Sequence, residues 1–286
     1  MKIKHIYSII IILLSTQANY GQNRELNKKI IHEMREAINA ENQIAFTLQR
    51  KEREIDGDEF ISGKFYSKLN VKPFKMYIKN FYPSPGSEIL YVDGWNNNKA
   101  LINPNAFPYI CLSFEPENSL VLAGGHHCIK EAGFKLMSRM FEHYEKVYGQ
   151  KLYDYIVYNG IFKWNDRKCH KITVTYPDYR ILNFKCKEGD NLYKIADRML
   201  LNVSKLRELN PKIDDTDYLE EGQTIKITNV YGEKAILLID TENKFPIYQE
   251  IHDKKGLYEK YMYLTLEINH SIPNEEFSRD YKDYNF

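Results

Sequence analysis

One short block, residues 182–228, carries two kinds of hydrophobic spacing and restricts what this chain can fold into. It opens with alternating positions around Phe184 and Cys186, which is typical of a half-buried strand. Gly189-Asp190 then predicts a turn and a helix N-cap, because an Asp side chain can accept from free amides of a first helical turn. Apolar residues at three- and four-residue spacing predict a helix over 192–199.

The second half of the block repeats this logic. Asn202 is a candidate cap for a second short helix over 203–209, and Asn210-Pro211 predicts its end, because proline disfavours the helical state in the residue before it. Alternation over 224–228 predicts a returning strand. The predicted order is strand, helix, helix, strand.

The block, called the insert below, resembles the LysM module, a small binder of glycans that contain N-acetylglucosamine, such as peptidoglycan. The resemblance is carried by FKCKEGDNL at 184–192, by Ile195-Ala196, by LRELNP at 206–211 and by LEEGQTIKI at 219–227. It implies that the ligand lies between two loops, one after the first strand and one after the second helix. The implied glycan-binding residues are Gly189, Asp190, Asn191 and Leu192 in the first loop and Asn210, Pro211, Lys212 and Ile213 in the second.

Two alternatives stay open for the insert. Backbone amides and carbonyls in such loops can pair with an N-acetyl group, yet Asp190 and Asn210 could equally be caps alone. A βααβ module can also pack without binding anything, since a fold does not imply a function. Cys186 stands where the family usually has a β-branched apolar residue, and a small buried hydrophobe keeps the same core.

Residues 1–21 predict a signal peptide, and therefore a periplasmic or secreted protein. Lys2 and Lys4 precede an apolar run at 6–14 that is too short to span a bilayer. Removing this segment removes two lysines and no acids, so the formal net charge changes from +1 to −1. Interspersed charges of both signs argue against nucleic-acid binding, and no later stretch predicts a transmembrane segment.

The remaining sequence predicts one discontinuous β-rich domain, residues 22–181 and 229–286, called the host below. Helices are expected at 23–40 and at 128–148, the second ended by Gly149 as its C-terminal glycine. Period-two alternation predicts strands at 44–48, 60–69, 74–78, 89–92, 101–102, 109–114, 153–164, 169–176, 235–239, 245–251 and 261–268. A short tail is expected after them. The two end strands of a βααβ module lie side by side, so it can interrupt the host without stretching it.

The host resembles a family of uncharacterised exported bacterial proteins related to the LolA/LolB-like periplasmic lipoprotein carriers. The residues that carry this are RKEREIDG from Arg50, PFKMYI from Pro73, SEILYVDG from Ser87, GGHH from Gly124 and KGLYEKYMY from Lys255. The resemblance implies an α+β fold in which helices cover the concave side of a curved antiparallel sheet, a half-barrel, with the βααβ insert added. Carriers of that shape hold acyl chains between sheet and helices. A plain packed core is the alternative.

The clusters that invite a chemical role have simpler explanations. A zinc site needs three or four convergent ligands, whereas His126 and His127 are adjacent and point apart on an extended chain. We expect them to lead into the helix, near its free amides. The cysteines, Cys111, Cys128, Cys169 and Cys186, allow one or two disulfides in three pairings. Because Cys186 is expected in the core of the insert, one disulfide or none is favoured over two. No nucleophile-elbow motif is present, and we expect no catalytic residue, metal or cofactor.

The sequence therefore favours an exported, non-enzymatic envelope protein that binds peptidoglycan or a chitin-like glycan through the insert. The host would hold an apolar ligand, such as a lipid, or a protein partner such as a lipoprotein. One alternative is a peptidoglycan-acting enzyme targeted by the insert, because LysM modules often accompany such enzymes. Another is a structural envelope protein whose β domain is filled.

Overall fold

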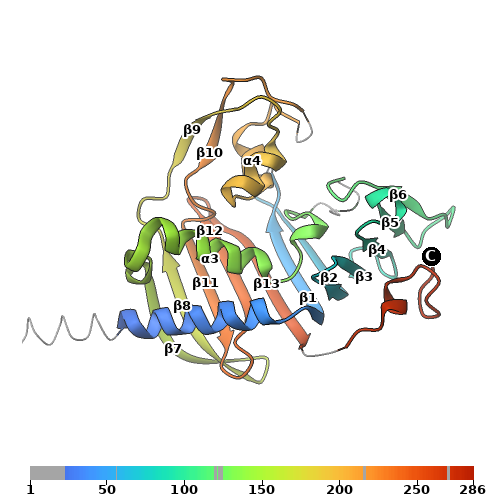
Figure 1. The fold of residues 1–286 in the computed structure, drawn as a ribbon, viewed down its shortest axis with the longest axis horizontal. Coiled ribbons are helices and arrows are strands. Elements are labelled where there is room, and N and C mark those ends of the chain that lie inside the picture. Colours follow the sequence, from blue (N-terminus) through green and yellow to red (C-terminus); the bar gives the residue numbers. More distant parts are fainter. Residues whose placement is uncertain (1–22, 56, 119–120, 122–124, 215–216, 269–270) are drawn as a thin grey trace, which may run out of the picture.

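A computed structural model describes residues 23–55, 57–118, 121, 125–214, 217–268 and 271–286 (Figure 1). The expected signal peptide, residues 1–21, lies outside the described residues. The described chain is α+β: a large, curved antiparallel sheet covered by helices, and a small second sheet in the insert. The expected fold class is confirmed.

The large sheet has eleven strands in the spatial order β6-β5-β4-β3-β2-β1-β13-β12-β11-β8-β7. Its strands are β1 (Gln43–Arg53), β2 (Phe60–Asn70), β3 (Lys75–Tyr82), β4 (Glu88–Val92), β5 (Ala100–Asn103), β6 (Leu112–Phe114), β7 (Ile156–Trp164), β8 (Arg167–Thr175), β11 (Lys234–Asp240), β12 (Pro246–Asp253) and β13 (Gly256–Glu267). All neighbouring pairs are antiparallel, and β1 pairs with β2 on one side and with β13 on the other. The first and last strands therefore meet in the middle of the sheet.

Two helices cross the concave face of this sheet (Figure 1). The helix over residues 23–40 is the one expected, and it buries Ile30, Met34 and Ile38 in the host core. Helix α3 (Lys135–Tyr148) adds Phe141 and Tyr144 to the same core. Apolar stripes on both helices thus cover the inward side of the strands.

The helix expected at 128–148 is shorter than the prediction. Residues Ile129–Glu131 form a 3-10 turn, η2, and α3 begins only at Lys135. Gly133 between them has φ +85°, and a Cβ on it would lie 2.7 Å from the Leu69 side chain. The backbone must therefore turn sharply against β2 at this point, which a continuous helix could not do. Gly149 ends α3 as expected, and its N–H donates to the carbonyl of Glu145.

Two strands are also shorter than expected. The strand predicted at 109–114 begins only at Leu112, as β6, because Tyr109 has φ +56°, which lies outside the strand region. The strand predicted at 153–164 begins at Ile156, because Gly149–Tyr155 form a 3-10 helix, η3. Apolar residues such as Leu152 are buried there by a helical turn rather than by strand pleating.

The insert leaves the large sheet after β8 and returns at β11, two strands that pair with each other. Its strands, β9 (Ile181–Lys185) and β10 (Thr224–Thr228), pair antiparallel, with α4 (Leu192–Met199) and α5 (Val203–Leu209) between them. Leu206 and Ile225 lie in a separate small core. The predicted order strand, helix, helix, strand is confirmed, while the domain boundaries stay a prediction.

The C-terminal residues are packed on β3 and β4. Two short 3-10 helices, η1 (Asn96–Asn98) and η4 (Asn274–Phe277), lie in the connections on this side of the sheet. The ring of Tyr284 stacks on Tyr77 with centroids 3.7 Å apart, and the Asn285 N–H donates to buried Glu88 at 2.8 Å. The expected tail is therefore a fixed part of the host.

All four cysteines are free thiols, so neither one nor two disulfides form in this structure. Cys128 and Cys169 lie in the host core, and Cys186 lies in the insert core. In the described ranges, no helix combines the length and the apolar character needed to cross a membrane.

Candidate functional site

The first expected glycan loop, residues 189–192, joins β9 to α4. Gly189 has φ +73° and open space on its Cβ side, a backbone state that glycine adopts without strain. The Asp190 carboxylate forms a two-point ion pair with Arg198, at 2.8 and 2.9 Å, and accepts from the Lys187 N–H. The hydrogen bonds from Arg198 are the main reason that the pKa of Asp190 is lowered to about 2. Asp190 therefore stabilises the loop by linking it to Arg198 of α4.

The cap of α4 is Asn191, not the expected Asp190. Asn191 Oδ1 accepts from the Lys194 N–H at 2.9 Å, and its backbone is extended as a cap requires. Leu192, the next residue, is fully buried in the insert core. One residue separates the two candidate caps, and only the folded turn decides which of them reaches the helix.

The second expected loop, residues 210–213, follows α5. The Asn210 amide donates to the carbonyls of Leu206 and Lys226, and its oxygen accepts from the Lys226 N–H at 2.9 Å. It therefore ties the end of α5 to β10. Ile213 packs against the same small core that contains Leu192.

The structure thus brings both predicted loops to one core, yet it uses most of their side chains internally. Pro211 and Lys212 are exposed. At the start of α4 the Asn191 side chain accepts from the Lys194 N–H, and the Gly189 carbonyl accepts from Lys194 Nζ. Toward solvent, the second loop offers Pro211 and Lys212.

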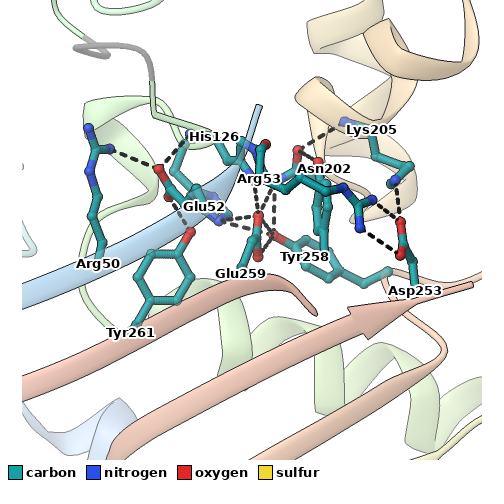
Figure 2. A network of polar contacts seen from close by, with 12 residues as sticks. Arg50, Glu52, Arg53, His126, Asn202, Lys205, Asp253, Tyr258, Glu259 and Tyr261 are labelled. Carbon is teal, nitrogen blue, oxygen red and sulfur yellow. Dashed lines mark hydrogen bonds and ion pairs between the residues drawn. The ribbon is translucent and has the colours of Figure 1, made fainter. Parts of the chain in front are cut away.

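A buried polar seam fixes the insert on the host (Figure 2). We call it the docking seam; its members are Asn202, Lys205 and Glu208 of the insert and Arg53, Tyr231, Asp253, Tyr258 and Glu259 of the host. Asn202 and Lys205 are each 3% exposed. Polar groups buried this deeply are stabilising only when they are hydrogen-bonded, and in the seam they are.

Asn202 is the expected cap of α5 and also the centre of the seam. Its Oδ1 accepts from the Lys205 N–H and from the Tyr258 hydroxyl, each at 3.1 Å. Its Nδ2 donates to the Tyr231 hydroxyl at 2.9 Å and to Glu259 Oε1 at 2.8 Å. One amide therefore connects a helix start of the insert to two segments of the host.

The second half of the seam is ionic. Lys205 Nζ donates to Asp253 at 2.7 Å and pairs with Glu208, while Arg53 pairs with Asp253 from the other side. Burial acts to raise the pKa of Asp253, but the hydrogen bonds from Arg53 and Lys205 outweigh it and lower the value to about 2. Both cations and both carboxylates are therefore matched within the interface.

The two histidines contact carboxylates rather than the free helix amides expected for them. His126 Nδ1 lies 2.8 Å from Glu259, and His127 Nδ1 lies 3.0 Å from Glu131. Burial acts against a charged His127, but the charge of Glu259 and the hydrogen bond to Glu131 raise its pKa well above the usual range. Burial likewise acts to raise the pKa of Glu259, and His127 and His126 lower it to about 2.

Beside the seam, the concave side of the sheet is hollow. A cavity of about 160 Å³ lies between α3 and the inward faces of the central strands. Its apolar walls include Phe46, Leu48, Phe65, Met76, Ile78, Ile89, Leu136, Met137, Met140, Ile251 and Tyr263. A second space of about 40 Å³ shares Met137 and Met140 with it. Cavities of this size, lined by apolar side chains, hold small apolar molecules in other proteins.

Thiol chemistry has little support at this cavity. Cys128 lines it, but burial raises the pKa of its thiol to about 12, and the thiolate is the reactive form. In the part of the chain that the structure describes, no three His, Cys, Asp or Glu side chains are grouped to hold a metal ion.

The sequence did not predict the docking seam, and it predicted that His126 and His127 would lie near free helix amides rather than near carboxylates. Arg53, Asn202 and Glu259 lie far apart in the chain and carry no shared motif. A signal was present in the alternation of β1 and β13, because Glu52 and Glu259 fall on the same face as the apolar positions. Charged residues on an inward face predict buried partners.

Comparison with curated proteins finds a partial relative. A stretch of 86 residues is 36% identical to the endolysin of Bacillus phage PZA, covering 30% of this chain and 31% of the endolysin. The chain therefore matches about a third of that relative's length.

Several solved structures resemble the fold at low sequence identity. The MucA/MucB complex of Pseudomonas aeruginosa matches with a TM-score of 0.41 at 10% identity, over 88% of this chain and 60% of that one, so less than two thirds of its length is spanned. A LolA superfamily protein of Nitrosomonas europaea matches with a TM-score of 0.34 at 10% identity, over 89% of this chain and 98% of that one. Mycobacterium tuberculosis lipoprotein LppX matches with a TM-score of 0.40 at 10% identity, over 86% of this chain and 98% of that one.

Two family models match the chain itself. The LysM domain matches residues 185–228, which confirms the resemblance drawn from the insert. A family described as a protein of unknown function, DUF1571, matches residues 26–200, more than half of the chain, and reaches the first helix of the insert. The chain is therefore a member of the DUF1571 family of proteins of unknown function, with a LysM domain inserted between strands β8 and β11.

Proposed function

We propose that this is an exported, non-enzymatic protein of the cell envelope, periplasmic or secreted, that binds peptidoglycan or a related N-acetylglucosamine glycan through the insert. The observation that carries this is the complete βααβ module over the LysM match, with its two loops built on one core. The residues proposed to form the glycan site remain Gly189, Asp190, Asn191, Leu192, Asn210, Pro211, Lys212 and Ile213.

Their proposed roles are of two kinds. The backbone of the first loop is proposed to pair with an N-acetyl group, while Pro211 and Ile213 offer apolar surface to the sugar face. Asp190 and Asn210 hold the two loops in place through Arg198 and β10. Recognition would therefore depend on backbone geometry more than on single side chains.

The host is proposed to hold an apolar ligand, or an apolar segment of a protein partner, in the cavity under α3. The supporting observation is that the concave side is hollow rather than filled, with Met137 and Met140 on its wall. Methionine side chains adapt to differently shaped apolar molecules. A structural protein with a solid core would have no such space.

The glycan proposal is tested by retention of the full chain on insoluble peptidoglycan. Gly189→Phe places a bulky side chain in the first loop, and Gly94→Phe in the host is the matched control, since φ is +73° and +79° and both have open space. We expect the control and the natural chain to be retained and Gly189→Phe to be lost from the pellet. Equal retention of both variants would overturn the proposal.

Deleting the insert would be a poorer test. It removes Asn202 and Lys205, which bond the host carboxylates Glu259 and Asp253, and so takes one buried partner from each. Breaking a buried polar network is destabilising, and loss of retention would then not separate binding from unfolding.

The endolysin match favours one alternative, a peptidoglycan-acting enzyme. Its acid or nucleophile would have to come from the host, where Glu259 is fully hydrogen-bonded and Cys128 is a poor thiolate former. Release of soluble muropeptides by the purified full chain would establish the enzyme and overturn the non-enzymatic assignment; intact peptidoglycan after incubation is the expected result.

A further inference from the structure

The cavity under α3 changes from apolar to polar along its length. On β1, Phe46 and Leu48 are followed on the same face by Arg50 and Glu52. The register places Leu48 opposite Tyr263 and Glu52 opposite Glu259, so both central strands become polar in the same direction. That direction leads to the insert, because Glu259 is bonded to Asn202. The cavity therefore has an apolar end and a polar end.

The lining of the polar end carries more acidic than basic side chains. The carboxylates that line it are Glu52, Glu131 and Glu259, and the cations are Arg50 and His127, three against two; His126 contacts Glu259 but does not line the cavity. Arg50 lies 3.2 Å from Glu52, and the Tyr261 hydroxyl also donates to Glu52. The positive groups at this end are therefore already engaged by the protein's own carboxylates.

One carboxylate that lines the polar end, Glu131, is partly exposed. Glu131 Oε2 accepts from the Cys128 N–H and contacts the His127 ring, and the Glu131 side chain is 30% exposed. For its other oxygen, Oε1, no protein donor lies within hydrogen-bonding distance among the described residues. Glu131 and Met137 both line the cavity, so one bound molecule can place its chain near Met137 and its head near this oxygen.

We propose that the cavity binds a single-chain amphiphile whose head donates hydrogen bonds and carries no negative charge. The apolar walls take the chain, and Glu131 Oε1 accepts from a hydroxyl or ammonium group on the head. A carboxylate or phosphate head would bring a further buried anion to an end that is already lined by more carboxylates than cations, which is unfavourable. This inference rests on the proposed apolar ligand and names its chemical class.

The test compares three molecules with the same chain: decanol, decylamine and decanoate at neutral pH. Methyl-labelled methionine spectra of the full chain report binding, because Met76, Met137 and Met140 line the cavity, while Met199 lies on α4 of the insert. We expect decanol and decylamine to shift the three cavity methyl signals and to leave Met199 in place. Decanoate should bind at least tenfold more weakly.

Charge at Glu131 provides a second, sharper readout. Glu131→Gln should reduce the ratio of decanol to decanoate affinity by at least threefold, since it removes one negative charge from the polar end. Glu142→Gln, at a partly exposed position of α3 that does not line the cavity, should leave that ratio unchanged.

The outcomes separate this inference from the function on which it rests. Decanoate binding as tightly as decanol, or an unchanged ratio in Glu131→Gln, would overturn the head-group assignment alone. If none of the three molecules shifts a cavity methyl signal, the proposed apolar ligand fails and the inference fails with it.

Discussion

The two helices of the insert begin in the same way and lie in opposite surroundings. Asn191 caps α4 through the Lys194 N–H and is only partly buried. Asn202 caps α5 through the Lys205 N–H and is buried against the host with three further hydrogen bonds, to Tyr231, Tyr258 and Glu259. The difference shows that the start of α5 is docked deeply on the host, whereas the side chain that caps α4 stays partly exposed.

The largest effect is expected where the seam is ionic. Asp253→Ala should lower the free energy of unfolding by about 4 kcal/mol, because it leaves Arg53 and Lys205 buried without their shared carboxylate. Asp197→Ala is the matched control: Asp197 also pairs across the interface, with Arg139, but both side chains are exposed. Asp197→Ala should lower the free energy of unfolding by less than about 0.5 kcal/mol. Urea unfolding of both variants measures this, and similar losses would contradict a buried seam.

The two caps give the next largest contrast. Asn202→Ala should cost about 3 kcal/mol, since it removes a cap and leaves buried partners such as Glu259 less satisfied. Asn191→Ala should cost about 1 kcal/mol, the usual value for a cap alone. If chemical denaturation gave the same loss for both, the insert would not be docked as described.

The pH dependence of stability tests the same seam with a smaller effect. Glu259 and Asp253 have pKa values lowered to about 2, so their contribution is complete above pH 5 and is lost as the pH falls through their folded values. The pKa of His127 is raised, so its contribution is complete below about pH 6 and is lost as the pH rises through its folded value. Stability should be greatest between about pH 5 and 6 and lower by about 2 kcal/mol at pH 3.

Unfolding midpoints across pH 3 to 9 measure this profile. His127→Gln should flatten the alkaline side, whereas the exposed His143→Gln should leave the profile as it is. A stability that kept rising above pH 8 would contradict the charged His127–Glu259 pair.

The smallest effect is expected on the loop side. Lys212→Ala should change affinity for a chitin oligosaccharide by less than about threefold, because recognition there is assigned to backbone groups and a single exposed charge contributes little. Lys187→Ala, another exposed lysine of the insert, is the control. Calorimetric titration measures both, and a loss of tenfold or more in Lys212→Ala alone would move recognition onto that side chain.

What the sequence predicts well is local. The cap at Asn202, the stop at Asn210-Pro211 and the C-terminal glycine at Gly149 each follow from a few neighbouring residues, and the structure has all three. The predicted cap of α4, Asp190, was wrong by one residue, since Asn191 is the cap. Both side chains can cap a helix, and the conformation of the turn decides which of them reaches the helix amides.

What the sequence could not predict depends on contacts between distant segments. The pairing of β1 with β13 places Glu52 opposite Glu259, and Asn202 reaches Glu259 only because the insert folds back onto these strands. The cavity is similar: alternation predicts that Leu48 faces inward, but whether α3 fills the space beneath it depends on how the helix is placed. Gly133 sets that placement by forcing a turn before the helix begins.

The most direct test of the account is an amide chemical-shift titration of the full chain with a chitin oligosaccharide. We predict saturable shifts at residues 189–192 and 210–213, with the amides of Asn202 and Lys205 unmoved because they are fixed against the host. Shifts at the seam with none at the two loops, or no shifts at all, would contradict the claim that a docked insert presents its free loops to a glycan.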